Sequence, residues 1–135
     1  MSLQWSTGVR NAILDQIETT IGASAILKIR TGAAPASCAT ADSGTVLATL
    51  PLPSDWMAAA SAGAKAKTGT WQDTSADAAG TAAHYRLYAT DGTTGHSQGT
   101  VTATSGGGDM EVDNVVFAPG QSFTVTTFQW TAPGA

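Results

Sequence analysis

Residues 109–130 read DMEVDNVVFAPGQSFTVTTFQW, and this stretch decides the fold. At its start, apolar Met110 and Val112 alternate with three acidic residues. A period of two puts the apolar side chains on one face of an extended chain and the carboxylates on the other. The alternation therefore predicts a half-buried β-strand.

A tight turn and a second strand complete this stretch. Residues 118–121 read APGQ, in which proline presets a negative φ and glycine supplies a positive one, so the chain can reverse. In the strand that follows, Phe123 and Val125 share one parity, whereas Phe128 and Trp130 share the other. The change of parity predicts a β-bulge between the two pairs, and the whole stretch is expected to form a hairpin.

Turn-forming residues divide the rest of the chain into short extended segments. Five more strands are predicted over residues 25–31, 45–50, 65–72, 81–90 and 98–104, with a short helical turn over residues 55–60. Seven short strands predict a mainly β fold, an antiparallel β-sandwich of the jelly-roll kind. The 135 residues suit one domain, with an arm and helix over residues 1–22 and a β-sandwich body over residues 23–135.

An amphipathic helix is predicted between Thr7, a candidate N-cap, and Gly22. Its apolar residues recur at spacings of three and four and form one stripe: Val9, Ala12, Ile13, Ile17 and Ile21. The stripe either packs across the sheet of its own domain or forms an assembly surface for a partner subunit. Packing on the sheet of its own domain is the favoured alternative.

Two further regions are candidates for contact with a partner. Leu3 and Trp5 lie in an N-terminal arm before any periodic element. Residues 32–44 (GAAPASCATADSG) form a long loop without periodicity, and such loops are often interaction elements. With the helix stripe, these regions give the predicted partner contacts: Leu3, Trp5, Val9, Ile13, Ile17, Pro35 and Cys38.

The chain carries little charge. Charged residues make up 12% of it, against roughly 25% in an average soluble protein, and ten acidic against six basic residues give a net charge of −4. A negative chain without a basic stripe is a poor ligand for nucleic acid, so no nucleic-acid partner is expected. Low charge suits a surface that another subunit covers and also suits a plain β-domain. The basic pairs Lys28/Arg30 and Lys65/Lys67 have strand spacing and are expected on solvated faces.

The single cysteine, Cys38, excludes an internal disulfide. No run approaches the roughly 18 apolar residues of a membrane span, and the first ten residues lack the pattern of a secretory signal. We therefore expect no membrane partner, and folding in a reducing cytoplasm.

Few residues are candidates for catalysis. His84 and His96 are the only histidines, and the predicted hairpin separates them by five to six residues of strand, roughly 18 Å. Each is therefore expected to face solvent or to make a hydrogen bond. The sequence has neither a GxSxG motif nor a neighbouring Cys-His pair, so no enzymatic activity and no cofactor are expected.

Two ligand hypotheses are weaker than their structural alternatives. Asp109, Glu111 and Asp113 could hold calcium, but an extended strand turns successive carboxylates apart, so a solvated or partner-facing acidic stripe is expected. The four tryptophans could form a platform on which sugars stack. Tryptophans are more often anchors of a core or an interface, and that role is expected here.

Segments that span most of the chain carry a family resemblance. They are TGVRNAILDQIETTIG (7–22), PLPSDWMAAASAG (51–63) with KAKTGTW (65–71), HYRLY (84–88) with DGTTGH (91–96), and DNVVFAPGQSFTVTTF (113–128). Together they resemble a family of small structural proteins encoded by tailed bacteriophages.

The resemblance implies a non-enzymatic virion component with a β-sandwich body. Its implied role is that of a decoration or cement protein, which binds the major capsid protein on the capsid surface as a homo-oligomer, a dimer or trimer, after assembly in the host bacterial cytoplasm. The alternative is a tail-associated β-sandwich module that binds a host glycan or another tail protein. In neither case does the resemblance supply an active site.

Overall fold

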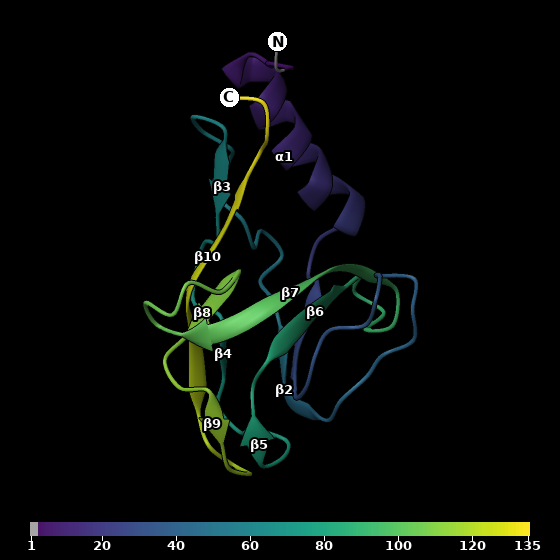
Figure 1. Cartoon of the computed structure of the whole chain (residues 1–135), viewed down its shortest axis with the longest axis vertical. Helices are drawn as coiled ribbons and strands as arrows, with labels where there is room; N and C mark the ends of the chain where they lie inside the picture. Colours follow the sequence, from purple (N-terminus) through teal and green to yellow (C-terminus); the bar gives the residue numbers. More distant parts are fainter. Residues whose placement is uncertain (1–2) are drawn as a thin grey trace.

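The computed structural model describes residues 3–135 and shows a helix packed over one end of a curled β-sheet (Figure 1). Residues 1–2 of the predicted arm lie outside the described residues. The elements are α1 (Thr7–Ile21), β1 (Ile26–Arg30), β2 (Val46–Pro51), β3 (Ala64–Ala66), β4 (Gln72–Asp73), β5 (Gly80–Thr81), β6 (His84–Tyr88), β7 (Gly95–Ala103), β8 (Met110–Val112), β9 (Val116–Phe117) and β10 (Phe123–Thr131). The prediction of a mainly β fold with one N-terminal helix is confirmed.

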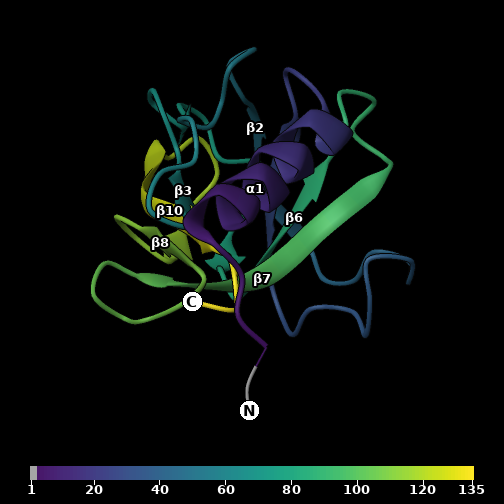
Figure 2. The same ribbon diagram turned by 90° about the horizontal axis from the view of Figure 1, so that it is seen from above.

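The main sheet is mixed. Its strand order is β2-β1-β6-β7-β8-β10-β3, with β4 paired to β10 beside this path, and β5 and β9 form a separate pair. Neighbouring strands run antiparallel except β7 and β8, which run parallel. The prediction of a purely antiparallel arrangement is therefore wrong. The sheet curls like half a barrel around the core, and α1 lies across it when seen from above (Figure 2).

The parallel pair arises from the connection between β7 and β8. Here the backbone N–H of Gly106 donates to the carbonyl of Ala103, and the N–H of Thr100 donates to the Asp109 carboxylate at 2.9 Å. A Cβ at Gly106 would lie 2.7 Å from the side chain of Thr102, so the loop folds back closely over β7. Strand β8 thus begins with Met110 beside Val101 and runs in the same direction as β7.

The closing hairpin matches its prediction in part. Met110 and Val112 are buried, and β8 pairs antiparallel with β10. The pairing register shifts between Val125 and Thr127, which confirms the predicted bulge. At the turn, Gly120 has a φ of +80°. The short strand β9, however, pairs with β5 and not with β10.

Aromatic rings fill the centre of the core. Trp56 and Trp71 are buried, with ring centroids 6.0 Å apart, and Phe128 and Trp130 pack beside them at 5.5–5.7 Å. The segment around the buried Trp56 is not helical. The N–H of Ala58 donates to the carbonyl of Ala66, so the chain runs extended beside β3. The predicted helical turn over residues 55–60 is therefore wrong.

Two other boundaries differ from their predictions. The strand expected over residues 65–72 is divided into β3 and β4 by a turn in which Gly69 has a φ of +72°. The N-cap of α1 is Ser6 instead of Thr7, because the Ser6 hydroxyl accepts a hydrogen bond from the N–H of Val9. The helix ends at Gly22, as predicted.

Candidate functional site

Several polar side chains attach helix α1 to its own domain. Lys65 of β3 is buried and donates to carboxylate oxygens of Asp15 and Glu18 at 2.7 Å each. Asn11 accepts a hydrogen bond from the N–H of Gly63, and the Arg10 guanidinium donates to a carbonyl beside the end of β10. The prediction that Lys65 lies on a solvated face is wrong, because the carboxylates of α1 cover it.

The apolar stripe of α1 is consequently turned partly away from the core. Ile21 and the intervening Leu14 are buried, but Val9 and Ile17 keep 44% and 37% of their surface exposed, and Ile13 is half-buried. The first alternative, packing on the domain's own sheet, accounts for only the end of the stripe at Ile21. The rest of the stripe is available for contact with another molecule.

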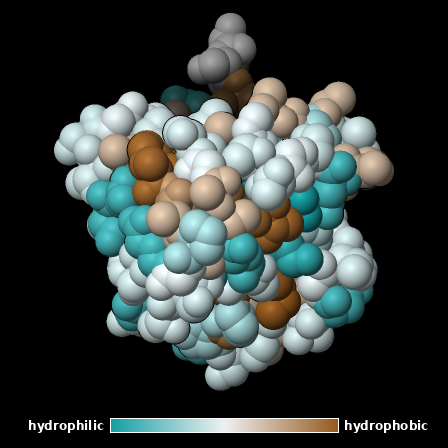
Figure 3. Space-filling view, turned by 90° about the horizontal axis from the view of Figure 1, so that it is seen from below, coloured by the Kyte–Doolittle hydropathy of each residue, from teal (hydrophilic) through white to brown (hydrophobic). Residues whose placement is uncertain are grey.

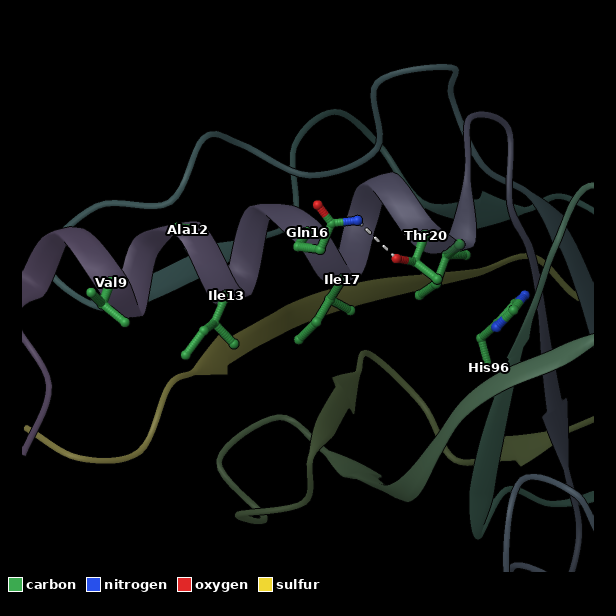
Figure 4. A pocket seen from close by; sticks show the side chains of 8 residues that line it. Val9, Ala12, Ile13, Gln16, Ile17, Thr20 and His96 are labelled. Carbon is green, nitrogen blue, oxygen red and sulfur yellow. Dashed lines mark hydrogen bonds between the residues drawn. The ribbon is translucent and has the colours of Figure 1, made fainter. Parts of the chain in front are cut away.

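These side chains line a cavity of about 620 Å³, which we call the apolar groove. Val9, Ile13 and Ile17 project from α1 toward the same side, and His96 of β7 lies across from the far end (Figure 4). Gln16 donates to the hydroxyl of Thr20 along the rim at 3.1 Å. The groove is lined almost entirely by aliphatic carbon.

A second cavity of about 590 Å³ adjoins the apolar groove and shares Ile13 and Ile17 with it. We call it the slot. It lies between α1, β7 and β10, and Tyr85 and Phe128 line its inner part in an edge-to-face contact. Among residues 3–135, Asp109 is the one charged residue that lines it. The slot is thus more polar than the groove beside it.

The N-terminal arm binds partly to the C-terminal segment of its own chain. The N–H of Trp5 donates to the carbonyl of Gly134 at 2.8 Å, and a Cβ at Gly134 would meet the indole ring. Trp5 is 41% exposed and Leu3 is 75% exposed. Of these two predicted contacts, Leu3 is the freer to reach a partner.

The loop over residues 32–44 is held against the sheet. Arg86, which is buried, donates to the carbonyls of Cys38 and Thr40 at 2.7 and 3.0 Å, and Gln98 donates to the carbonyl of Pro35. Pro35 is half-buried, whereas Cys38 is exposed. The loop therefore offers the Cys38 side chain to solvent while its backbone is fixed.

One carboxylate of this loop binds two arginines. Asp42 accepts from Arg30 at 2.8 Å and from Arg86 at 2.5 Å, and the hydroxyl of Tyr88 also donates to it. Burial disfavours the charged carboxylate, but the Tyr88 hydrogen bond and the two guanidinium groups outweigh it and hold the pKa of Asp42 below its ordinary value. Arg30 is buried, so its predicted place on a solvated face is wrong.

The two histidines do not come together. His84 lies opposite Thr100 in the β6–β7 pair, four residues from His96, which corresponds to roughly 13 Å along the strand. His84 is buried with Nδ1 2.7 Å from the carbonyl of Gly32, and His96 is exposed. Both expected roles, hydrogen-bonded and solvent-facing, are confirmed, with a shorter separation than the sequence suggested.

The acidic stripe is engaged in local hydrogen bonds. Asp109 accepts from Thr100, and Asp113 accepts from the N–H of Thr124 at 3.0 Å. Glu111 accepts from the N–H of Gly107. Within residues 3–135, no three His, Cys, Asp or Glu side chains are placed to hold a metal ion.

The tryptophans do not form a common platform. The indole N–H groups of Trp56 and Trp71 are bonded to backbone carbonyls inside the protein, and both rings are buried. Trp130 is half-buried at the slot, and Trp5 lies on the arm. The prediction of core anchors is confirmed for Trp56 and Trp71.

The end of the molecule opposite α1 differs from the α1 side. Seen from below, its apolar colour is divided into separate patches by polar and neutral surface (Figure 3). Val116 of β9 is an exposed apolar residue, 60% accessible, but it lines neither the apolar groove nor the slot. It therefore serves as a control position for tests of the α1 surface.

Comparison with known proteins finds no matching family model, no matching curated protein and no matching solved structure. In residues 3–135 no helix has both the length and the apolar character needed to cross a membrane.

Proposed function

We propose that this chain is a non-enzymatic structural protein that binds another protein through the apolar groove and Leu3. The observation that carries the proposal is the outward-turned stripe of α1. Val9 and Ile17 remain exposed although the helix is fixed in place by Lys65 and its carboxylate partners. Exposed apolar patches often mark sites of protein interaction. The aliphatic side chains that this fixed helix displays therefore support a protein-binding role.

The partner that we propose is the major capsid protein of a tailed bacteriophage. The support is the resemblance of residues 7–22, 51–63, 65–71, 84–88, 91–96 and 113–128 to small phage structural proteins. In this role the chain decorates the capsid surface after assembly in the host cytoplasm, and its curled sheet serves as the sandwich-like body of a decoration protein. Binding the assembled shell and not the free subunits would stabilise the shell by mass action.

The size of the apolar surface favours an oligomer. Complete burial of one aliphatic side chain contributes about 1.5–3 kcal/mol, and Val9, Ile13 and Ile17 are already partly covered. Association costs roughly 4–15 kcal/mol in lost freedom of motion. A single copy therefore binds weakly, whereas a dimer or trimer on a lattice gains from high effective concentration.

The test is co-sedimentation of the purified chain with assembled shells of the phage that encodes it. We expect the chain to pellet with the shells, and Ile13→Asp and Ile17→Asp to reduce the bound fraction at least about tenfold because each buries a charge in the interface. Val116→Asp is the matched control and should bind like the unchanged chain. Size-exclusion chromatography with light scattering gives the oligomeric state.

Failure of the unchanged chain to pellet with shells rejects the capsid assignment. If the chain instead binds isolated tails, the tail-associated alternative replaces it. Equal loss of binding in the Val116 control would mean that added charge, and not the apolar groove, is responsible.

A further inference from the structure

The main sheet opens between β7 and β10. Both strands have nine residues, but β8, which lies between them, has only three. β8 pairs with β7 over residues 101–103 and with β10 no further than Phe128. Beyond Met110 no described strand occupies the space between β7 and β10, and the slot lies there.

Backbone groups of β10 face this opening. Toward β3, the carbonyl of Phe128 accepts from Lys67, and the N–H of Ala132 donates to Gly63. Because backbone groups of successive residues point to opposite sides of a strand, Gln129 and Thr131 direct theirs toward the slot. Both residues are exposed and line the slot. This edge of β10 is therefore available for pairing.

The facing edge of β7 is partly capped. Val101 donates its N–H to Ala83 on the β6 side, so Thr100 and Gln98 direct theirs toward the slot. The carboxylate of Asp109 accepts the N–H of Thr100 and blocks that position. Among the slot's two strand edges, β10 is thus the more open one, and Asp109 also lines the cavity.

We infer that the slot binds an extended segment of the partner protein, which pairs with the edge of β10 at Gln129 and Thr131. This inference rests on the proposed function, since it specifies how the partner reaches the α1 surface. Added strands gain affinity from main-chain hydrogen bonds and specificity from alternate side chains. A helix, roughly 10–12 Å across with its side chains, would leave the edge groups of β10 unpaired.

The lining defines the segment's chemistry. The free edge spans three residues, so the segment needs three or four extended residues, about 10–13 Å. One side chain points toward Ile13 and Ile17 and should be apolar. Asp109 places a carboxylate in the slot and the chain is negative overall, so a lysine or arginine is expected at that end.

The experiment uses a library of displayed seven-residue peptides, selected against the full chain. We expect enriched peptides to combine apolar residues with lysine or arginine. The bound peptide should slow hydrogen exchange at the backbone amides of Gln129 and Thr131, measured by NMR in the unchanged protein. Thr131→Pro, which removes one N–H at the edge, should weaken binding about tenfold, whereas Thr131→Val keeps that N–H and should bind normally.

Several outcomes overturn the inference. One is that the selection enriches no peptide, and another is that the bound peptides leave the amides of Gln129 and Thr131 exchanging as fast as in the unbound protein. The inference also fails if the peptides bind as helices, or if the slot binds saccharides through Trp130 instead of peptides. Shell binding without amide protection removes the strand-pairing inference and leaves the proposed function standing. If peptides protect these amides but the chain does not bind shells, the proposed function is rejected and the strand-pairing site remains.

Discussion

Nζ of Lys65 donates a 2.7 Å hydrogen bond to Oδ1 of Asp15, which joins strand β3 to helix α1. The lysine is almost completely buried and binds Glu18 in the same way. Burial disfavours the charged ammonium group, but its two carboxylate partners outweigh that effect and raise the pKa of Lys65 above its ordinary value. The ion pairs therefore fix the helix in the orientation that exposes its apolar stripe.

Lys65→Met should loosen this attachment. The methionine fits the space of the lysine stem but leaves two carboxylates of α1 without their cation. We expect a melting temperature lower by about 5–10 °C, measured by circular dichroism. Lys67→Met, two residues along the same segment, is the control, because the Lys67 ammonium group contacts the carbonyl of Gly69 and the ring of Trp71 but no carboxylate of the described residues. Equal melting temperatures for both variants would show that the ion pairs do not hold the helix.

Asp42→Asn should destabilise the loop over residues 32–44. The substitution leaves the buried guanidinium groups of Arg30 and Arg86 without a counter-charge. Because the carboxylate is 38% exposed, the expected loss of unfolding free energy is moderate, about 1–3 kcal/mol. Urea denaturation measures it, and faster proteolysis within the loop should accompany it. The exposed Asp55 provides the control, and Asp55→Asn should change neither quantity.

The same carboxylate should make stability fall in acid. The folded-state pKa of Asp42 lies below its ordinary value of 3.8, so the ionised group stabilises the fold above that pH. This contribution is lost as pH falls through the folded-state pKa. The difference in unfolding free energy between the unchanged chain and Asp42→Asn should be constant near neutral pH and shrink below pH 3.8. A difference that stays constant in acid contradicts the assignment.

The closing hairpin could be predicted because its determinants are local. Alternation of Met110 and Val112 defines the strand face, and the parity change in β10 reports the bulge. The parallel pairing of β7 and β8 could not be predicted, since it depends on the contact of the Asp109 side chain with Thr100. No periodic pattern signals such a side-chain cap.

The buried cations were missed for a related reason. Arg30 and Lys65 have the strand spacing of solvated residues, and their burial depends on carboxylates that are distant in the sequence. Asp15 and Glu18, three residues apart on one helix face, were the available signal that a cation packs there. The apolar stripe of α1 is evident from its spacing. Whether the stripe packs in the core or forms an assembly surface depends on which face of α1 the ion pairs of Lys65 hold against the sheet.

Gly99 leaves room for the side chains of Asp109 and Tyr85, which both line the slot. A Cβ at this position would lie 2.8 Å from both the carboxylate of Asp109 and the ring of Tyr85. Gly99→Ala should therefore displace Asp109 and lower the unfolding free energy by about 1–3 kcal/mol through overpacking. It should also change the amide chemical shift of Thr100, whose N–H is bonded to Asp109.

Gly8→Ala is the matched control for this substitution. Gly8 lies in α1, where a Cβ would meet only the Ser6 hydroxyl at 3.9 Å. The alanine should leave stability unchanged or raise it by up to about 1 kcal/mol, since alanine favours the helix. Urea denaturation measures the unfolding free energy of both variants. It thus compares the effect of one added methyl group at a site with room for it, Gly8, and at a crowded site, Gly99. If Gly99→Ala is as stable as Gly8→Ala, the close approach of Asp109 to β7 is wrong, and so is the position of this carboxylate in the slot.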